Sequence, residues 1–184
     1  MIEICEGIKH LNLRITLPNA IRADLPLNRE NRFKMFKSMH EAGVVNFGLG
    51  VEHGDQEFLN EVTQKRLDLD EVRASCDLAH EAGILVHANF MIGFPFETKE
   101  NRDKTINFAK SLKSDSFSVS LVAPLPGTKL YDICKKHNLQ FRKTFFSSYR
   151  CFTCKKLKRN SKAIRTFSNK GRKRNRNFSN LQRR

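Results

Sequence analysis

The sequence has no apolar stretch close to the ~20 residues that a helix needs to cross a bilayer. It also lacks the start of a secretory signal peptide, since Met1–Glu6 is short of apolar length and carries two acidic side chains. These absences predict a cytoplasmic protein with no membrane partner. Its 184 residues are enough for one domain with a hydrophobic core.

Cysteine is present, but its spacing builds no recognisable site. The five cysteines are odd in number and irregular in spacing, which argues against a disulfide framework. No three of them are grouped as the thiolate ligands of an iron–sulfur cluster would be. Cys151 and Cys154 form the one close pair, so they are the only candidate metal ligands, and a half-site at most.

Acidic residues are missing from the end of the chain. Residues 1–132 hold 16 Lys and Arg against all 19 Asp and Glu, a net charge of −3, whereas residues 133–184 hold the other 18 basic residues and no acidic one. The net charge of +15 is therefore carried by the end of the chain. We expect a globular part over 1–132 and a basic, disordered tail over 133–184.

Within the first part, strand and helix patterns alternate. Alternating or continuous apolar residues predict strands, and apolar residues three or four apart after a capping side chain predict helices. Asp68 and Glu71 have the spacing of an N-cap and its N3 partner. The apolar run of the third strand is typical of a strand buried on both faces. The predicted strands are 11–17 (ended by Pro18-Asn19), 45–51, 84–92 and 116–122, and the predicted helices start at Asn28, Asp68 and Thr98.

A short repeat supports this alternation. The sequence His-Glu-Ala-Gly closes a predicted helix at His40–Gly43 and again at His80–Gly83. Strands that alternate with helices predict a parallel sheet with right-handed crossovers. The pattern alone leaves an open α/β sheet and a barrel equally well supported.

Function in parallel α/β folds gathers where strands end, so the residues that follow each strand carry the most information. Glu52 follows the second strand within Gly-Val-Glu-His-Gly, and Gly93 opens Gly-Phe-Pro-Phe-Glu-Thr after the third. The fourth strand is followed by Pro124-Leu-Pro-Gly-Thr128. Each motif alone is compatible with a loop that binds nothing. All three in this order indicate a ligand site.

This ordered set resembles the radical S-adenosylmethionine (radical SAM) superfamily, as does Ile21-Arg-Ala-Asp24 ahead of the first repeat. The resemblance covers about residues 1–132 and is to iron–sulfur oxidoreductase-type members, many of which carry a cobalamin-binding domain. It implies an α/β fold that is part of a (β/α)6 TIM-like barrel. It also implies an enzyme that binds S-adenosylmethionine and a [4Fe–4S] cluster and acts on a substrate through a 5′-deoxyadenosyl radical.

The resemblance also implies roles for particular residues. Glu52 is expected to contact the amine or ribose of S-adenosylmethionine, and Lys65 to lie near its carboxylate. His53 stands where relatives often have serine, and is as compatible with a solvated loop as with a changed polar contact. The residues expected to border the adenine are Asn89, Met91, Gly93, Val122 and Ala123. The resemblance assigns no catalytic residue.

One feature of the family is missing, namely the Cys-x-x-x-Cys-x-x-Cys loop that holds the cluster. We therefore expect a fragment whose first strands and cluster loop lie upstream of Met1, and which is inactive and binds no cluster by itself. Two alternatives remain open: a non-catalytic protein that binds nucleic acid through its cationic tail, and an unrelated α/β barrel enzyme without a metal. The tail itself fits a phosphate-binding arm, a metal half-site at Cys151 and Cys154, or out-of-frame translation.

Overall fold

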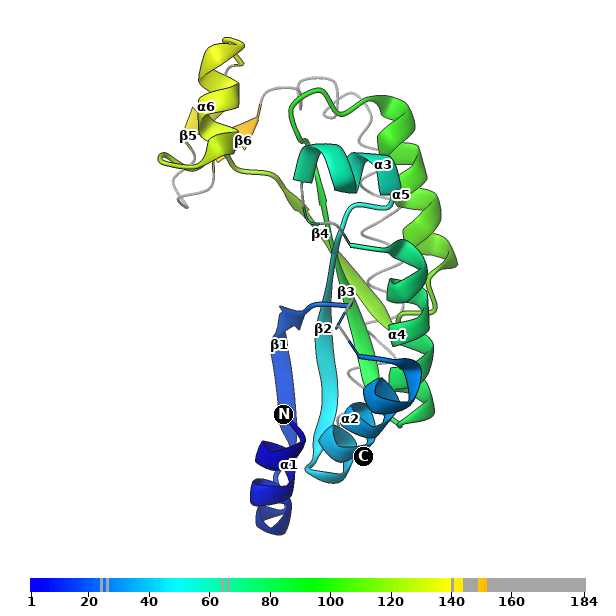
Figure 1. The fold of residues 1–184 in the computed structure, drawn as a ribbon. Coiled ribbons are helices and arrows are strands. Elements are labelled where there is room, and N and C mark those ends of the chain that lie inside the picture. Colours follow the sequence, from blue (N-terminus) through cyan, green and yellow to red (C-terminus); the bar gives the residue numbers. More distant parts are fainter. Residues whose placement is uncertain are drawn as a thin grey trace.

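A parallel four-stranded sheet forms the centre of the molecule in the computed structural model, which describes residues 1–23, 25, 27–63, 65, 67–139, 141–143 and 149–151. Its strands follow the chain in order, each paired in parallel with the next. Figure 1 shows the sheet curled, with helices along one side. This is the expected part of a TIM-like barrel, a half-barrel of four strands. The strands are β1 Ile15–Ile21, β2 Val44–Glu52, β3 Leu85–Ile92 and β4 Ser116–Leu121.

Three helices cover one face of the sheet: α2 Arg29–Glu41, α4 Leu69–Glu81 and α5 Lys99–Ser111 (Figure 1). Each begins at the predicted cap, because the side chains of Asn28, Asp68 and Thr98 accept hydrogen bonds from backbone N–H groups of the first turn. The remaining elements are short. They are α1 Ile2–Ile8, a 3-10 turn Lys9–Leu11, α3 Gln56–Phe58 with a π-helical turn Leu59–Thr63, α6 Lys129–Lys136, and the antiparallel pair β5 Phe141–Lys143 and β6 Tyr149–Cys151.

The hydrophobic core lies between the sheet and these helices. Phe47 and Leu49 of β2 and Phe36 of α2 are almost completely buried, and the rings of Phe36 and Phe47 stack at 5.4 Å. Burial of this kind stabilises by about 25 cal/mol for each Å² of apolar surface removed from water. The core therefore holds the strands side by side, and their carboxyl ends lie at one edge.

The repeated His-Glu-Ala-Gly segments end α2 and α4 in the same way. The N–H of Gly43 donates to His40 O, and the N–H of Gly83 donates to His80 O, both at 2.9 Å. Both glycines have left-handed backbones, with φ of 95° and 86°. The inference that the repeat marks two successive strand–helix units is confirmed.

The bounds predicted for the first strand, 11–17 with an end at Pro18-Asn19, are wrong. Residues 9–11 form the 3-10 turn, and β1 runs from Ile15 through Pro18 to Ile21. Its pairing with β2 is interrupted between Leu17 and Ala20, a bulge that leaves the proline outside the hydrogen-bonded ladder. In the described part of the chain β1 pairs only with β2, and strands with one neighbour tolerate proline at bulges.

Two further expectations are corrected. The third strand is not buried on both faces: Val86, Ala88 and Phe90 are buried, whereas alternate residues such as His87 and Asn89 are half-buried. The helices described here cover only one face, so burial alternates. Glu71 is not the partner of the Asp68 cap, because its carboxylate binds Arg32 of α2. Among the described helices, none is long and apolar enough to span a membrane.

Candidate functional site

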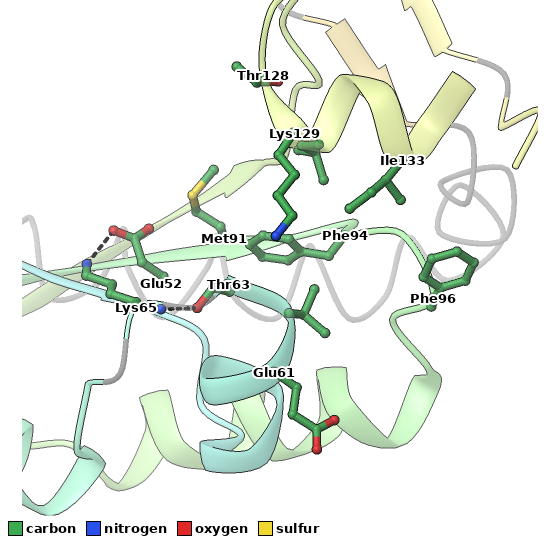
Figure 2. Close-up of a pocket in the computed structure, with 12 residues that line it drawn as sticks. Glu52, Glu61, Thr63, Lys65, Met91, Phe94, Phe96, Thr128, Lys129 and Ile133 are labelled. Atoms are coloured by element: carbon green, nitrogen blue, oxygen red, sulfur yellow. Dashed lines mark hydrogen bonds and ion pairs between the residues drawn. The ribbon is translucent and has the colours of Figure 1, made fainter. Parts of the chain in front are cut away.

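A cavity of about 670 Å³ opens at the carboxyl ends of β2 and β3. Figure 2 shows that its side chains come from these strand ends, from the turn that follows α3 and from the start of α6. Its volume lies within the range of about 300–1,000 Å³ typical of small-molecule sites. The lining residues are Glu52, Glu61, Val62, Thr63, Lys65, Met91, Phe94, Phe96, Thr128, Lys129, Leu130 and Ile133.

An ion pair between Glu52 and Lys65 forms one side of this cavity (Figure 2). The Lys65 ammonium donates to Glu52 Oε1 and to the backbone oxygen of Gly50, both at 2.8 Å. The two side chains are 27% and 20% exposed, so both can still be reached by a ligand. Hydrogen bonds between charged groups of this kind are about twice as strong as neutral ones.

The backbone at Glu52 is itself unusual. Its φ is 68°, a left-handed value that is rare outside glycine, and the pairing of β2 with β3 shifts between Gly50 and Glu52. The bulge turns the carboxylate away from the regular strand direction and toward the cavity. Such local strain concentrates at functional sites.

Beside the cavity, His53 is completely buried, so the reading of it as a solvated loop residue is wrong. Its Nδ1 accepts a hydrogen bond from the N–H of Asp55 at 3.2 Å, which leaves the proton on Nε2. Nε2 then donates to Glu97 Oε1 at 3.2 Å. The other oxygen of Glu97 accepts from the N–H of Gly93 at 2.7 Å. One buried network thus joins the ends of β2 and β3.

The second glycine of the Glu52 motif has a packing role. A Cβ on Gly54 would lie 2.6 Å from Thr105 Cα and 2.7 Å from Phe108 Cβ, so α5 leaves room only for hydrogen. The N–H of Gly54 also donates to Thr105 Oγ1 at 3.0 Å. The segment after β2 is therefore fixed against α5.

Asp55 completes this attachment. Its carboxylate caps α3, accepts from Asn101 Nδ2 at 2.9 Å and pairs with Lys104 at 3.0 Å. Burial alone raises the pKa of Asp55, but the hydrogen bonds from Asn101 and Lys104 outweigh it and hold that pKa below its ordinary value. The charged carboxylate thus keeps the start of α3 in place beneath the cavity.

The predicted site residues separate into two groups. Glu52, Lys65 and Met91 line the cavity. Gly93 is buried with φ of 88°, Asn89 accepts from Ser118 Oγ at 2.7 Å, and Val122 is buried in an apolar cluster with Phe58 and Phe94. Ala123, half-buried, follows Val122 at the end of β4. Asn89 lies within β3, and the other three follow the ends of β3 and β4. None of the four lines the cavity, and their contacts with adenine stay predictions.

Several lining residues went unnoticed in the sequence. Leu130 and Ile133 lie on one side of α6, and their spacing of three is a helical signal that could have been used. In the sequence, Phe94 and Phe96 indicate no more than a turn motif. Nothing in the sequence separates Phe96, which is exposed, from Phe94, which is buried.

Cluster ligands are not found in the part of the chain that the structure describes. Cys5, Cys76 and Cys134 are buried on three different helices, and no three His, Cys, Asp or Glu side chains there are grouped to hold a metal ion. The Cys151 side chain and residues 140, 144–148 and 152–184, which include Cys154, lie outside the described residues. The tail boundary at 132, which falls within α6, and the three interpretations of the tail stay predictions.

Comparison with known proteins identifies the family. The model of the radical SAM superfamily matches residues 6–109, more than half of the chain. The chain therefore belongs to this superfamily, and the resemblance inferred from the strand-end motifs is confirmed. It is 32% identical over 117 residues to an uncharacterised methyltransferase of Pyrococcus horikoshii, covering 61% of this chain and 25% of that protein.

A second relative is the anaerobic magnesium-protoporphyrin IX monomethyl ester cyclase of Cereibacter sphaeroides. It is 32% identical over 98 residues, which is 53% of this chain and 16% of the cyclase. The chain thus spans a quarter or less of the length of these relatives.

Solved structures show the same fold. The radical S-adenosylmethionine methyltransferase TsrM of Kitasatospora setae, with cobalamin and a [4Fe–4S] cluster bound, superimposes with a TM-score of 0.61 at 18% identity, over 78% of this chain and 30% of TsrM. Coproporphyrinogen III oxidase of Escherichia coli, also a radical SAM enzyme, gives 0.55 at 20% identity, over 67% of this chain and 29% of that one. The half-barrel is therefore a segment of the radical SAM barrel fold. As expected for the family, TsrM binds a [4Fe–4S] cluster and cobalamin, and the radical enzyme OxsB, another such neighbour, binds S-adenosylmethionine and cobalamin.

Proposed function

We propose that this chain forms the S-adenosylmethionine-binding side of a radical SAM enzyme site, and that residues 1–132 are the barrel segment that carries it. The observation that supports this most directly is the Glu52–Lys65 pair, which presents an anion and a cation to a cavity at the carboxyl ends of the strands. The methionine part of the cofactor carries the complementary charges, an ammonium and a carboxylate.

Each charge has a defined task. The Glu52 carboxylate accepts hydrogen bonds from the cofactor amine or from ribose hydroxyls, and the Lys65 ammonium attracts the carboxylate. Gly93, with its left-handed backbone, lets the chain turn away at the end of β3. When bound, S-adenosylmethionine would supply the 5′-deoxyadenosyl group for the superfamily's radical chemistry, and the electron for that chemistry would come from the cluster. This chain's residues hold and orient it.

The described residues fit the cofactor but not the cluster, since they bring no set of thiolates together. We therefore assign the cluster ligands to a segment other than the described one and derive no step from them. Anaerobic reconstitution of the 184-residue chain with iron and sulfide should leave it without the visible absorbance of an iron–sulfur cluster. Stable incorporation of a cluster would overturn this assignment.

Binding of S-adenosylmethionine and of methionine by calorimetry tests the proposal. Glu52→Gln and Lys65→Met should each weaken the binding of both ligands by about tenfold, because each removes a hydrogen bond between charged groups. Glu3→Gln is the matched control, since Glu3 is an exposed carboxylate on α1. Equal affinity in the site variants and the control would show that the pair binds no cofactor.

A further inference from the structure

Phe96 occupies a backbone conformation that favours glycine. The N–H of Glu97 donates to Phe94 O at 3.2 Å and closes a four-residue turn, with Pro95 and Phe96 at its two central positions. Phe96 has φ of 64°. A turn with proline at the first central position and positive φ at the second is a type II turn, in which the second position is normally glycine or asparagine. Phenylalanine there strains the backbone.

Packing within the described part of the chain does not explain this strained phenylalanine. Its side chain is 57% exposed, whereas the neighbouring Phe94 is buried. Its one ring contact there is with His137 in edge-to-face geometry, with ring centroids 5.0 Å apart and planes at 84°. A ring that stays largely in water gains little from the hydrophobic effect, so folding alone does not favour phenylalanine over glycine here.

The position of the ring suggests what it does. Figure 2 shows Phe96 at the wall of the cavity opposite the Glu52–Lys65 pair, with Phe94 and Ile133 nearby. The Glu52–Lys65 pair thus lies at one end of the cavity and the Phe96 ring at the other, while Glu61 and Lys129 also contribute charge to the lining. The apolar side chains of the lining are Val62, Met91, Phe94, Phe96, Leu130 and Ile133.

We propose that Phe96 is a ligand-binding residue, whose ring forms the wall against which a planar, uncharged ring of the ligand packs. Exposed aromatic faces pair with other planar rings in stacked or edge-on geometry, and the contact with His137 orients the face. The inference rests on the proposed function. The planar ring has two sources, the adenine of the cofactor or an aromatic ring of the substrate.

The experiment uses the 184-residue chain with two substitutions of Phe96 and one control. Phe96→Gly removes both ring and strain, and Phe96→Tyr keeps the ring. Leu125→Ala removes an exposed apolar side chain that does not line the cavity. Binding is followed by ligand-observed saturation-transfer NMR with adenosine, tryptophan and methionine, and stability by thermal unfolding.

We expect Phe96→Gly to unfold at a higher temperature than the wild type, and to bind a ring probe about two- to tenfold more weakly. Phe96→Tyr and Leu125→Ala should bind that probe as the wild type does. If Phe96→Gly binds adenosine more weakly, the ligand ring that packs on Phe96 is the base of the cofactor. If only the binding of tryptophan is weakened, that ligand ring belongs to the substrate.

Three results would overturn the proposal. In the first, the wild-type protein binds neither ring probe. In the second, Phe96→Gly binds the ring probes as strongly as the wild type does. In the third, Phe96→Gly unfolds at a lower temperature than the wild type. The last would show that the ring serves the fold. Methionine binding reports on Glu52 and Lys65 and should not change in any Phe96 variant, so a failure of the cofactor assignment is seen separately.

Discussion

His53 and Glu97, 44 residues apart in the chain, form a buried hydrogen-bonded pair with side chains 0% and 1% exposed. The pair joins the segment that follows β2 to the turn that follows β3. It also holds the N–H of Gly93 through the second carboxylate oxygen. Both walls of the cavity therefore depend on one interaction that lies beneath it rather than in it.

Removal of either partner should be costly. His53→Ala leaves Glu97 Oε1 without its donor and opens a void against Phe58, whose ring stacks on the imidazole at 4.3 Å. We expect a loss of about 3 kcal/mol in the free energy of unfolding. In a double-mutant cycle with Glu97→Gln, measured by urea unfolding, the double mutant should lose about 1–3 kcal/mol less than the sum of the two single losses. Strictly additive losses would mean that the pair is not coupled.

Gly54 tests how closely the segment after β2 packs against α5. Gly54→Ala places a methyl group 2.6 Å from the backbone of α5, so the helix must move or the segment after β2 must detach. The expected loss of stability is about 1–3 kcal/mol, as for overpacked sites. Gly7→Ala is the control: its Cβ meets nothing within 4 Å, and it should stabilise α1 slightly. Thermal unfolding of both variants checks the prediction, which fails if they behave alike.

The sequence predicts well those features that depend on nearby residues. Strand and helix order, the caps at Asn28 and Thr98, and the matching ends of α2 and α4 follow from side chains within a few positions. It predicts poorly what depends on distant ones. The cap at Asp68 is local and was found, whereas the partner of Glu71 is Arg32, 39 residues away.

Some features of the candidate site could likewise be predicted from the sequence, and others could not. Glu52 follows from the order of the strand-end motifs and Lys65 from the family resemblance, and the structure brings them together. The burial of His53 and the exposure of Phe96 were not predictable, because α3, α5 and α6 surround them and their positions are set by the tertiary fold.

The long-range contact between Arg32 and Glu71 can be tested by substitution of Arg32. Its guanidinium is 6% exposed and donates to Glu71, to Ser75 Oγ and to two backbone oxygens that follow β1. Arg32→Met should therefore lose about 3 kcal/mol, since it removes one buried and three half-buried hydrogen bonds made by a charged group. Lys37→Met, on the exposed side of the same helix, should change stability by less than about 0.5 kcal/mol. Similar losses in both variants of α2, measured by urea unfolding, would contradict this.

Two asparagines on the sheet should respond in opposite directions. Asn46 is 6% exposed, and its Nδ2 has no hydrogen-bond partner among the described residues, whereas Asn89 accepts from Ser118 Oγ at 2.7 Å. Asn46→Leu should raise stability by about 1 kcal/mol because it removes an unsatisfied buried donor. Asn89→Leu should lower it. The midpoint of thermal unfolding distinguishes the two, and a destabilised Asn46→Leu would show that the amide is satisfied.

The stability of the protein should depend on pH through His80 and Asp115. His80 Nε2 lies 2.7 Å from Asp115 Oδ2, which also accepts from the N–H of Val86. The hydrogen bond with Asp115 raises the pKa of His80 above its ordinary value of 6.5. Burial opposes ionisation of Asp115, but the bonds from His80 and Val86 outweigh it and lower its pKa below 3.8. The folded state thus favours both charged forms.

The sign of the effect follows from these two shifts. Since the pKa of folded His80 is raised, its contribution is complete below pH 6.5 and is lost as the pH rises through the raised value. Since the pKa of Asp115 is lowered, its contribution is complete above pH 3.8 and is lost in stronger acid. At mildly acidic pH, where His80 is charged, the free energy of unfolding of the wild type should exceed that of His80→Gln by about 1 kcal/mol. That difference should shrink on going to mildly alkaline pH, and a difference that stays constant across this range would show that His80 is not held in its charged form.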